Sequence, residues 1–208
     1  MILDPARFMA RSALMGVCAT LLLTSCGGGG NSGGGGSTPT PTPSTANEWT
    51  WMSGSSTVTG ANGGQPGVYG SQGVAGAGNV PGSRGYSGTG WTDSSGSLWL
   101  FGGLGYDSTG NQGNLNDLWE FSPTTKEWTW MGGSNTTYAN ATQYQPDRGQ
   151  PGVYGTEGVP ATTNVPGGRY SAVSWTDNSG NFWLFGGAGH DSTAAQIGGL
   201  NDLWRYQP

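Results

Sequence analysis

Two short apolar runs of the same shape recur along the chain, each set between polar turn segments. They are Leu98–Phe101 and Phe182–Phe185, and a pair of glycines follows each one. A continuous apolar run of this length, bounded by turn residues, is typical of a strand that is covered on both faces. We therefore expect a buried strand at each position.

A second apolar segment precedes each run across a tight turn. Residues 84–91 lead into the turn 92–96, and residues 170–175 lead into the turn 176–180. The glycine that ends each turn can take the positive φ that tight hairpins need. The pattern predicts two β-hairpins.

More strand-like segments follow the first hairpin. Leu115–Phe121 leads through a turn containing Pro123 into Glu127–Met131, where Trp128 and Trp130 stand two residues apart and so project to one side of a strand. Each unit is therefore expected to be a four-stranded antiparallel meander. No segment of the mature chain has helical periodicity, and 42 glycines and 12 prolines argue against long helices. The predicted fold class is all-β.

All ten tryptophans form matched pairs, separated by 79, 84 or 85 residues. The pairs are Trp49 with Trp128, Trp51 with Trp130, Trp91 with Trp175, Trp99 with Trp183, and Trp119 with Trp204. One aromatic-rich unit has thus been written twice, which is the signature of a repeat protein.

The order of elements within each unit resembles the kelch repeat of β-propellers, in the style of galactose-oxidase-like proteins. The residues that carry the resemblance are Trp99–Gly103, Leu115–Trp119 and Trp128 in the first copy, and Trp183–Gly187 and Leu200–Trp204 in the second. It covers nearly all of residues 49–208. It implies four-stranded propeller blades with tryptophans packed between them, and with an Asn-Asp pair that caps the backbone at a strand start.

The blade count predicts an incomplete ring of about two blades. Residues 84–131 make a complete blade, residues 169–206 supply three strands of another, and residues 49–52 form a lone fourth strand that complements it. Two blades cannot close a ring, which typically has 4 to 8. Either the chain is a fragment of a longer propeller or several copies assemble as a homo-oligomer. The fragment interpretation is favoured, because residues 206–208 lie in the turn that should lead to another tryptophan strand.

The unit is longer than the kelch repeat of about 50 residues, and the excess lies in residues 53–83 and 132–168. Both segments contain Gln-Pro-Gly-Val-Tyr-Gly and end in Asn-Val-Pro-Gly. Because they keep an internal pattern, we expect these long loops to be ordered. In a meander they leave the blade at the same end as segments 104–114 and 188–199, which makes that end the predicted ligand-binding face.

The candidate binding residues on this long-loop face are tyrosines, aspartates and the single histidine of the chain. They are Tyr69, Tyr106, Asp107, Tyr138, Tyr154, His190 and Asp191. Exposed aromatic rings among Asn and Gly could stack on sugars, or the same rings could plug their own loops. Asp107 and Asp191 could hold a hard cation such as calcium, but the spacing matches no known calcium loop, and hydrogen bonds within the loops are the favoured explanation.

The N-terminus reads as an export signal over residues 1–25. Leu23–Cys26 resembles the lipobox of bacterial lipoproteins, which implies a lipidated Cys26 and a membrane anchor. Gly27 after the cysteine favours the outer membrane or cell surface of a bacterium. Residues 26–46 then form a Gly-rich and Thr-Pro tether. An ordinary signal peptide that happens to end near a cysteine is the alternative.

Charge and composition narrow the function further. Removing the signal leaves five basic and eleven acidic residues, and the basic ones are scattered, so a nucleic-acid partner is not expected. Galactose oxidase needs copper, histidine ligands and a cysteine–tyrosine cross-link, whereas this chain has one histidine and no mature thiol beyond Cys26. We therefore expect no cofactor, no metal and no enzyme activity.

The predicted function is a lipid-anchored, cell-surface binding module for a protein or a carbohydrate. The alternative is a truncated part of a kelch-class enzyme, such as a sugar isomerase, a mutarotase or an oxidase-like protein.

Overall fold

The computed structural model describes residues 47–58, 63–137, 148–193 and 197–208, of which residues 49–208 belong to one compact unit. The predicted signal, Cys26, the tether and Tyr138 lie outside the described residues.

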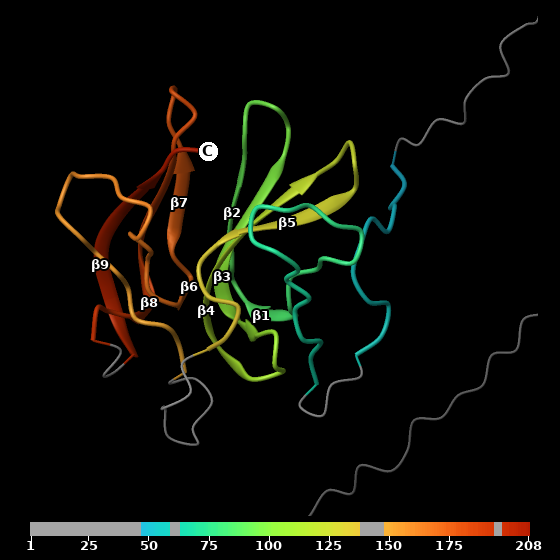
Figure 1. Cartoon of the computed structure of the whole chain (residues 1–208), viewed down its shortest axis with the longest axis horizontal. Coiled ribbons are helices and arrows are strands. Elements are labelled where there is room, and N and C mark those ends of the chain that lie inside the picture. Colours follow the sequence, from blue (N-terminus) through green and yellow to red (C-terminus); the bar gives the residue numbers. More distant parts are fainter. Residues whose placement is uncertain (1–46, 59–62, 138–147, 194–196) are drawn as a thin grey trace, which may run out of the picture. The chain divides into compact units, whose positions relative to one another are not determined.

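Within the described residues, nine antiparallel strands form two sheets (Figure 1). The first sheet contains β1 Arg84–Tyr86, β2 Thr89–Thr92, β3 Leu98–Tyr106, β4 Gln112–Ser122 and β5 Glu127–Gly132. The second contains β6 Arg169–Tyr170, β7 Val173–Thr176, β8 Phe182–His190 and β9 Ile197–Tyr206. The described residues contain no helix, so none that could span a membrane. The all-β prediction is confirmed.

Both predicted hairpins are present with the same register. Trp91 lies opposite Trp99 across β2 and β3, and Trp175 lies opposite Trp183 across β7 and β8. An aspartate holds each turn: Asp93 Oδ1 accepts hydrogen bonds from two backbone N–H groups of its turn, and its Oδ2 accepts one from Trp99 Nε1 at 2.9 Å. Asp177 makes the equivalent bonds. These hydrogen bonds hold the turn chain and the first tryptophan of the next strand together.

The first strand of each meander is broken in two, which the sequence pattern did not predict. Opposite the break, the register of β3 shifts between Phe101 and Gly103, and β8 shifts at the same place. Gly102 and Gly103 have φ values of 59° and 100°, a conformation that favours glycine and that makes a bulge in the strand. The glycine pair therefore bends the sheet.

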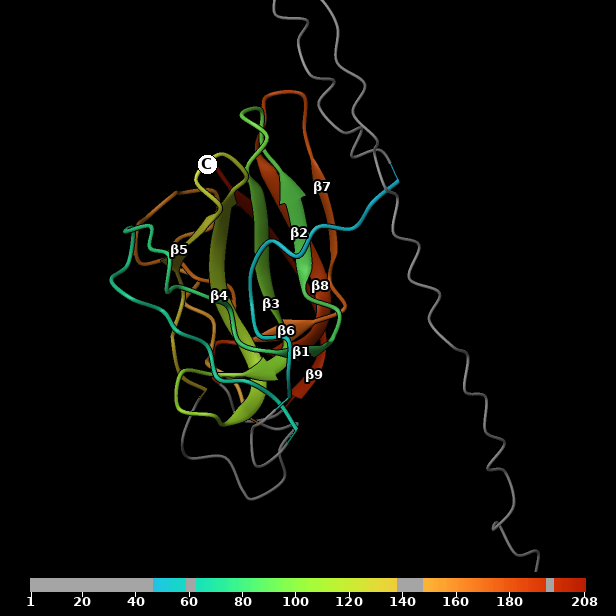
Figure 2. The same ribbon diagram turned by 90° about the vertical axis from the view of Figure 1, so that its right-hand side faces the viewer.

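The two sheets pack face to face through aromatic rings. Trp91 stacks on Phe182 with ring centroids 5.3 Å apart, and Trp99 meets Phe182 edge-on at 5.4 Å. Trp91 Nε1 also donates to the backbone oxygen of Trp183 at 3.3 Å. In both views β7 runs beside β2 (Figures 1 and 2). Tryptophans thus pack between the sheets, as expected.

The strand expected at residues 49–52 is not formed. These residues belong to no strand, Trp49 is fully exposed and Trp51 largely so. No described strand pairs with this segment, so its backbone makes no inter-strand hydrogen bonds. The other predicted strands are present, with four per meander in the first repeat and three in the second once each broken strand is counted as one.

Candidate functional site

A buried polar cluster lies between the long loop and β4 in the first repeat. Arg84 pairs with Asp117 through two parallel hydrogen bonds, from Nη1 to Oδ1 at 2.8 Å and from Nη2 to Oδ2 at 2.7 Å. Tyr69 Oη and Trp119 Nε1 each donate to Asp117 Oδ2 at 2.7 Å. Arg84 Nη1 also donates to the backbone oxygen of Gly102 in the bulge. We call these four side chains the first Arg–Asp cluster.

The second repeat contains the same arrangement, the second Arg–Asp cluster. Arg169 Nη1 and Nη2 donate to the two carboxylate oxygens of Asp202 at 2.6 and 2.8 Å. Tyr154 Oη and Trp204 Nε1 donate to Asp202 Oδ2 at 2.7 Å. Charge-assisted bidentate pairs of this kind fix geometry strongly.

Burial and hydrogen bonding shift the pKa values of both tyrosines and of Asp202. Burial, followed by the charge of Asp117, raises the pKa of Tyr69, and burial with the hydrogen bond to Asp202 raises the pKa of Tyr154 to about 12. Burial acts to raise the pKa of Asp202, but hydrogen bonds from Arg169, Trp204 and Tyr154 outweigh it and bring that pKa to about 2. The shifts move the pKa values of Tyr69, Tyr154 and Asp202 further from neutral pH, where a general acid or base works best.

The sequence analysis assigned the aspartate of each cluster a wrong role. The Asn116–Asp117 pair was expected to cap a strand start. Asp117 instead lies in the middle of β4 and accepts hydrogen bonds from the other three side chains of the cluster. The signal that could have found it is spacing: arginine and aspartate are 33 residues apart in both repeats, and tyrosine and aspartate are 48 apart in both.

The two loop aspartates hold their own loops. Asp107 is fully buried, and its Oδ1 accepts the backbone N–H groups of Thr109 and Asn111 while its Oδ2 accepts that of Thr137 at 2.8 Å. Asp191 is exposed and accepts from the backbone N–H and hydroxyl of Thr193, both at 2.7 Å. Both aspartates thus make the hydrogen bonds within their loops that the sequence favoured, and Asp107 also accepts one from the later loop at Thr137. No three His, Cys, Asp or Glu side chains meet as a metal site in the part of the chain that the structure describes.

His190 fills the same place as Tyr106. Both end the second strand of their meander, β3 and β8 respectively, and are buried. Each ring lies so close to a loop glycine, Gly64 for Tyr106 and Gly149 for His190, that the glycine has no room for a side chain. The histidine Nε2 lies 3.4 Å from the side-chain nitrogen of Asn114. This histidine is a packed core residue.

Four of the candidate residues on the predicted ligand-binding face are buried rather than exposed. Tyr69 is only 4% exposed, and Tyr106, Asp107 and His190 are buried too, while Tyr154 and Asp191 reach the surface. The physical reason is that the long loops fold back over the sheets. In the first repeat the loop even extends the sheet, because the backbone N–H groups of Gly73 and Gly76 donate to carbonyl oxygens of β5. Plugging of the loops, the alternative use of these tyrosines, is what Tyr69 does.

An open apolar surface lies elsewhere, on the side of the second sheet that faces away from the first. Its exposed members are Val173, Trp175, Phe185 and Leu203. Trp175 stacks in parallel on Trp183 with centroids 6.3 Å apart, and the Arg205 guanidinium lies 6.0 Å from the Trp183 ring centre. We call this surface the outer face of the second sheet.

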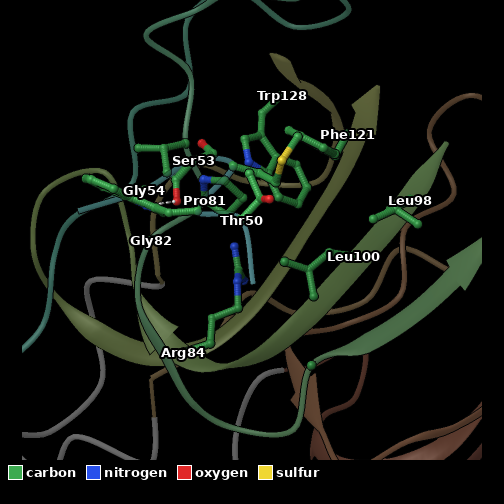
Figure 3. A pocket seen from close by; sticks show the side chains of 14 residues that line it. Thr50, Ser53, Gly54, Pro81, Gly82, Arg84, Leu98, Leu100, Phe121 and Trp128 are labelled. Atoms are coloured by element: carbon green, nitrogen blue, oxygen red, sulfur yellow. Dashed lines mark hydrogen bonds between the residues drawn. The ribbon is translucent and has the colours of Figure 1, made fainter. Parts of the chain in front are cut away.

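The first sheet has an apolar hollow on its own far side (Figure 3). The pocket has a volume of about 620 Å³ and lies between β3, β4 and β5 and the segment 50–54. Its apolar lining includes Leu98, Leu100, Phe121 and Trp128, and Arg84 also reaches it. We call this surface the outer face of the first sheet.

Comparison with known proteins gives no family for this chain: no protein-family model matches it, and a search of the curated proteins found no match either. What can be proposed of its function therefore depends on the two clusters and the two outer faces.

Proposed function

We propose that this protein is a lipid-anchored, kelch-type propeller module at the bacterial cell surface that binds another protein and catalyses no reaction itself. The observation that carries the proposal is the outer face of the second sheet. Contiguous exposed apolar side chains on a folded protein mark an interaction surface. Tryptophan and arginine, both present here as Trp175 and Arg205, are the residues that most often dominate binding energy.

A protein partner is favoured over a carbohydrate by the chemistry of that face. Val173 and Leu203 flank the tryptophan pair and are exposed. Aliphatic side chains complement apolar protein surface, whereas a sugar presents hydroxyl groups that need polar partners.

Three features support the kelch-type assignment beyond the sequence order. Both repeats have a glycine bulge in the second strand of the meander, both have an Arg–Asp cluster, and the two sheets stack face to face as neighbouring blades do. The lipobox-like end of the predicted signal supports attachment through Cys26, and the tether of residues 26–46 would hold the module away from the membrane.

A photocross-linking experiment tests the binding function. The full chain is expressed in a bacterium with p-benzoylphenylalanine placed at position 175, and a control variant has it at position 125, an exposed residue in the turn between β4 and β5. Illumination is expected to give a protein adduct from position 175 and none from position 125. Absence of any adduct at position 175, with the chain folded and exported, would overturn the proposal.

A further inference from the structure

We infer that the protein bound at this site is a second copy of the same chain, whose residues Glu48–Met52 join the edge of β9 as the missing fourth strand of the second sheet. The inference depends on the proposed binding function and names its partner. It is carried by four sets of observations on the two repeats.

The first is that Glu48–Met52 has the sequence of a strand that is already formed elsewhere in the molecule. The residues Glu-Trp-Thr-Trp-Met occur at positions 48–52 and again at 127–131, where they form β5 and pair with β4. In β5 the tryptophans are partly covered: Trp128 lies 5.0 Å from Phe121, and Trp130 lies 5.4 Å from Tyr69, measured between ring centroids. The same two side chains at positions 49 and 51 are exposed. The first copy thus has the sequence of a strand but pairs with no described strand.

The second is that the chain after this segment already has the conformation that follows β5. Trp51 Nε1 donates to the backbone oxygen two residues on at 2.7 Å, as Trp130 Nε1 does at 2.6 Å. Next, the backbone N–H of Thr57 donates to Ser55 Oγ at 3.1 Å, and Thr136 and Ser134 make the same bond at 3.1 Å.

A loop glutamine then fixes each turn. Gln65 Nε2 donates to the backbone oxygen of Thr57 at 3.0 Å, and Gln150 Nε2 donates to that of Thr136 at 2.9 Å. The turn that presents the segment is therefore formed before any partner binds, which lowers the entropy cost of association.

The third is that the second sheet has a place for this strand. β4 pairs with β3 on one side and β5 on the other, whereas β9 pairs only with β8 among the described strands. In the first repeat the long loop closes over β5, where Asn79 Nδ2 donates to the backbone oxygens of Val74 and of Trp128, both at 3.0 Å. Asn164 holds the equivalent loop in the same shape by donating to Val159 O at 3.1 Å. The loop of the second repeat thus keeps the internal amide bond that its counterpart over β5 has.

The second Arg–Asp cluster is more exposed than the first, and among the described strands β9 has no neighbour in the place that β5 takes beside β4. The side chain of Asp117 is fully buried while that of Asp202 is 15% exposed, and Tyr154 is 36% exposed against 4% for Tyr69. Trp130 covers Tyr69 in the first repeat. Trp51 of a second copy would cover Tyr154 in the same way. By analogy with the pairing of β4 and β5, it would stand opposite Trp204, and Thr50 would stand opposite Arg205.

The fourth is that the two outer faces match each other. Inside the chain, the Trp91 and Trp99 face of the first sheet covers the Phe182 and Tyr206 face of the second. The outer face of the second sheet repeats the face of the first sheet that carries Trp91 and Trp99, since Trp175 and Trp183 correspond to these two tryptophans.

The outer face of the first sheet repeats the face of the second sheet that carries Phe182 and Tyr206, because Leu98 and Phe121 stand in the places of these two residues. The second sheet of one copy can therefore stack on the first sheet of the next, as the sheets do within one chain. Such a contact is head-to-tail, and a closed ring of 4 to 8 blades would contain two to four copies.

Disulfide cross-linking between one introduced cysteine on each of two copies tests the pairing of Glu48–Met52 with β9. Two variants of the full chain, Thr50→Cys and Arg205→Cys, are purified separately, mixed and oxidised, with the wild-type chain alongside because it carries Cys18 and Cys26. Directly opposed residues of antiparallel strands have the Cα spacing that a disulfide needs. The expected result is a cross-linked dimer that contains a 50–205 peptide link and that neither variant forms alone. A third variant carries both Thr50→Cys and Arg205→Cys in one chain. If a 50–205 link forms only within single chains of this variant and never between the two separate variants, the inference is overturned.

The solution mass of the full chain provides the second readout. The wild type is expected to have the mass of two or more copies. The double variant Trp49→Ala/Trp51→Ala, which removes side chains exposed in the single chain, should weaken association by at least about 100-fold. The matched control Val68→Ala/Val74→Ala changes two exposed loop residues outside Glu48–Met52 and β9 and should associate like the wild type.

The outcomes separate this inference from the proposed function. A wild-type chain that stays monomeric, while position 175 still cross-links to a different protein, would overturn self-association and leave the binding function standing. A monomer with no adduct at position 175 would overturn both.

Discussion

The two Arg–Asp clusters are chemically the same and physically different. Each has an arginine, an aspartate, a tyrosine and a tryptophan at the same spacing and within 0.2 Å of the same hydrogen-bond lengths. Yet the tyrosine of the first is buried at 4% exposure, and that of the second is at the surface at 36%. The residues that recur in both repeats fix the bonding in each cluster, whereas the presence of β5 decides how much water reaches it.

This difference separates the clusters in energetic terms. A buried ion pair whose partner is removed leaves an uncompensated charge in a poorly solvated site, while a pair at the surface can use water instead. The same substitution made in both repeats therefore measures what β5 and its loop contribute. It also detects anything that fills the place beside β9 in the second repeat.

The largest contrast is expected from neutralising the aspartates. Asp117→Asn should lower the free energy of unfolding by about 3–5 kcal/mol, because Arg84 is then left charged and buried. Asp202→Asn should cost somewhat less, about 2–4 kcal/mol, because Arg169 is also left charged and buried but water reaches the side chain at position 202. Urea unfolding at one fixed protein concentration gives both values.

Glu157→Gln, on an exposed loop, serves as the control and should change stability by under about 0.5 kcal/mol. Equal costs for the two aspartates would mean that the second cluster is as dry as the first. Making Asp117→Asn and Asp202→Asn in the Trp49→Ala/Trp51→Ala background then tells whether a second copy excludes water from the second Arg–Asp cluster.

The bulge glycines are expected to give the next contrast. An added Cβ at Gly102 would lie 2.8 Å from the backbone oxygen of Arg169 in the other sheet, whereas one at Gly186 would meet only Leu200 O of its own sheet at 2.7 Å. Both have φ near 60°, which strains alanine by about 1–2 kcal/mol. Gly102→Ala should therefore cost about 3 kcal/mol and Gly186→Ala about 2 kcal/mol. Thermal unfolding would measure both, and a larger loss for Gly186→Ala would contradict the assignment of the sheet interface.

Much of the strand layout could be predicted from periodicity, and the reason is local. Apolar runs such as Leu98–Phe101 and turns such as Asp93–Gly96 specify their own conformation through alternation and positive-φ glycine. The broken first strand could not be foreseen in this way, because it results from a bulge in the neighbouring strand at Gly102 and Gly103.

The candidate site was harder to predict because burial depends on partners distant in sequence. Tyr69 and Tyr154 lie in the same hexapeptide, Gln-Pro-Gly-Val-Tyr-Gly, and nothing within it tells that one ring is buried and the other is not. That difference comes from Trp130, which is 61 residues beyond Tyr69 and has no counterpart beside Tyr154 among the described residues. The same limitation placed Asp117 at a strand start, although its partners Arg84 and Tyr69 come from two other segments.

Acid titration should measure the stability that Asp202 contributes in the second cluster. The pKa of Asp202 is about 2 in the folded protein against 3.8 for an unperturbed aspartate, so the unfolded chain binds a proton first as the pH falls. The contribution of Asp202, about 2 kcal/mol, is complete above about pH 4 and disappears as the pH falls towards 2. Unfolding followed by circular dichroism between pH 5 and 2 should show this slope reduced in Asp202→Asn. An unchanged slope would mean that Asp202 is not the titrating group.

The smallest contrast isolates a single hydroxyl in each cluster. Tyr69→Phe removes a buried hydrogen bond to a carboxylate, which should cost about 1.5 kcal/mol, because no water can replace the donor at Asp117. Tyr154→Phe should cost about 0.5 kcal/mol, because Asp202 is partly solvated. Tyr86→Phe, at an exposed ring, is the control. If the Tyr154→Phe cost is 1.5 kcal/mol in the wild type but falls to about 0.5 in the Trp49→Ala/Trp51→Ala background, the cluster is dried by the strand of a second copy; if it stays at 0.5 in both, the slot beside β9 is open to water in solution.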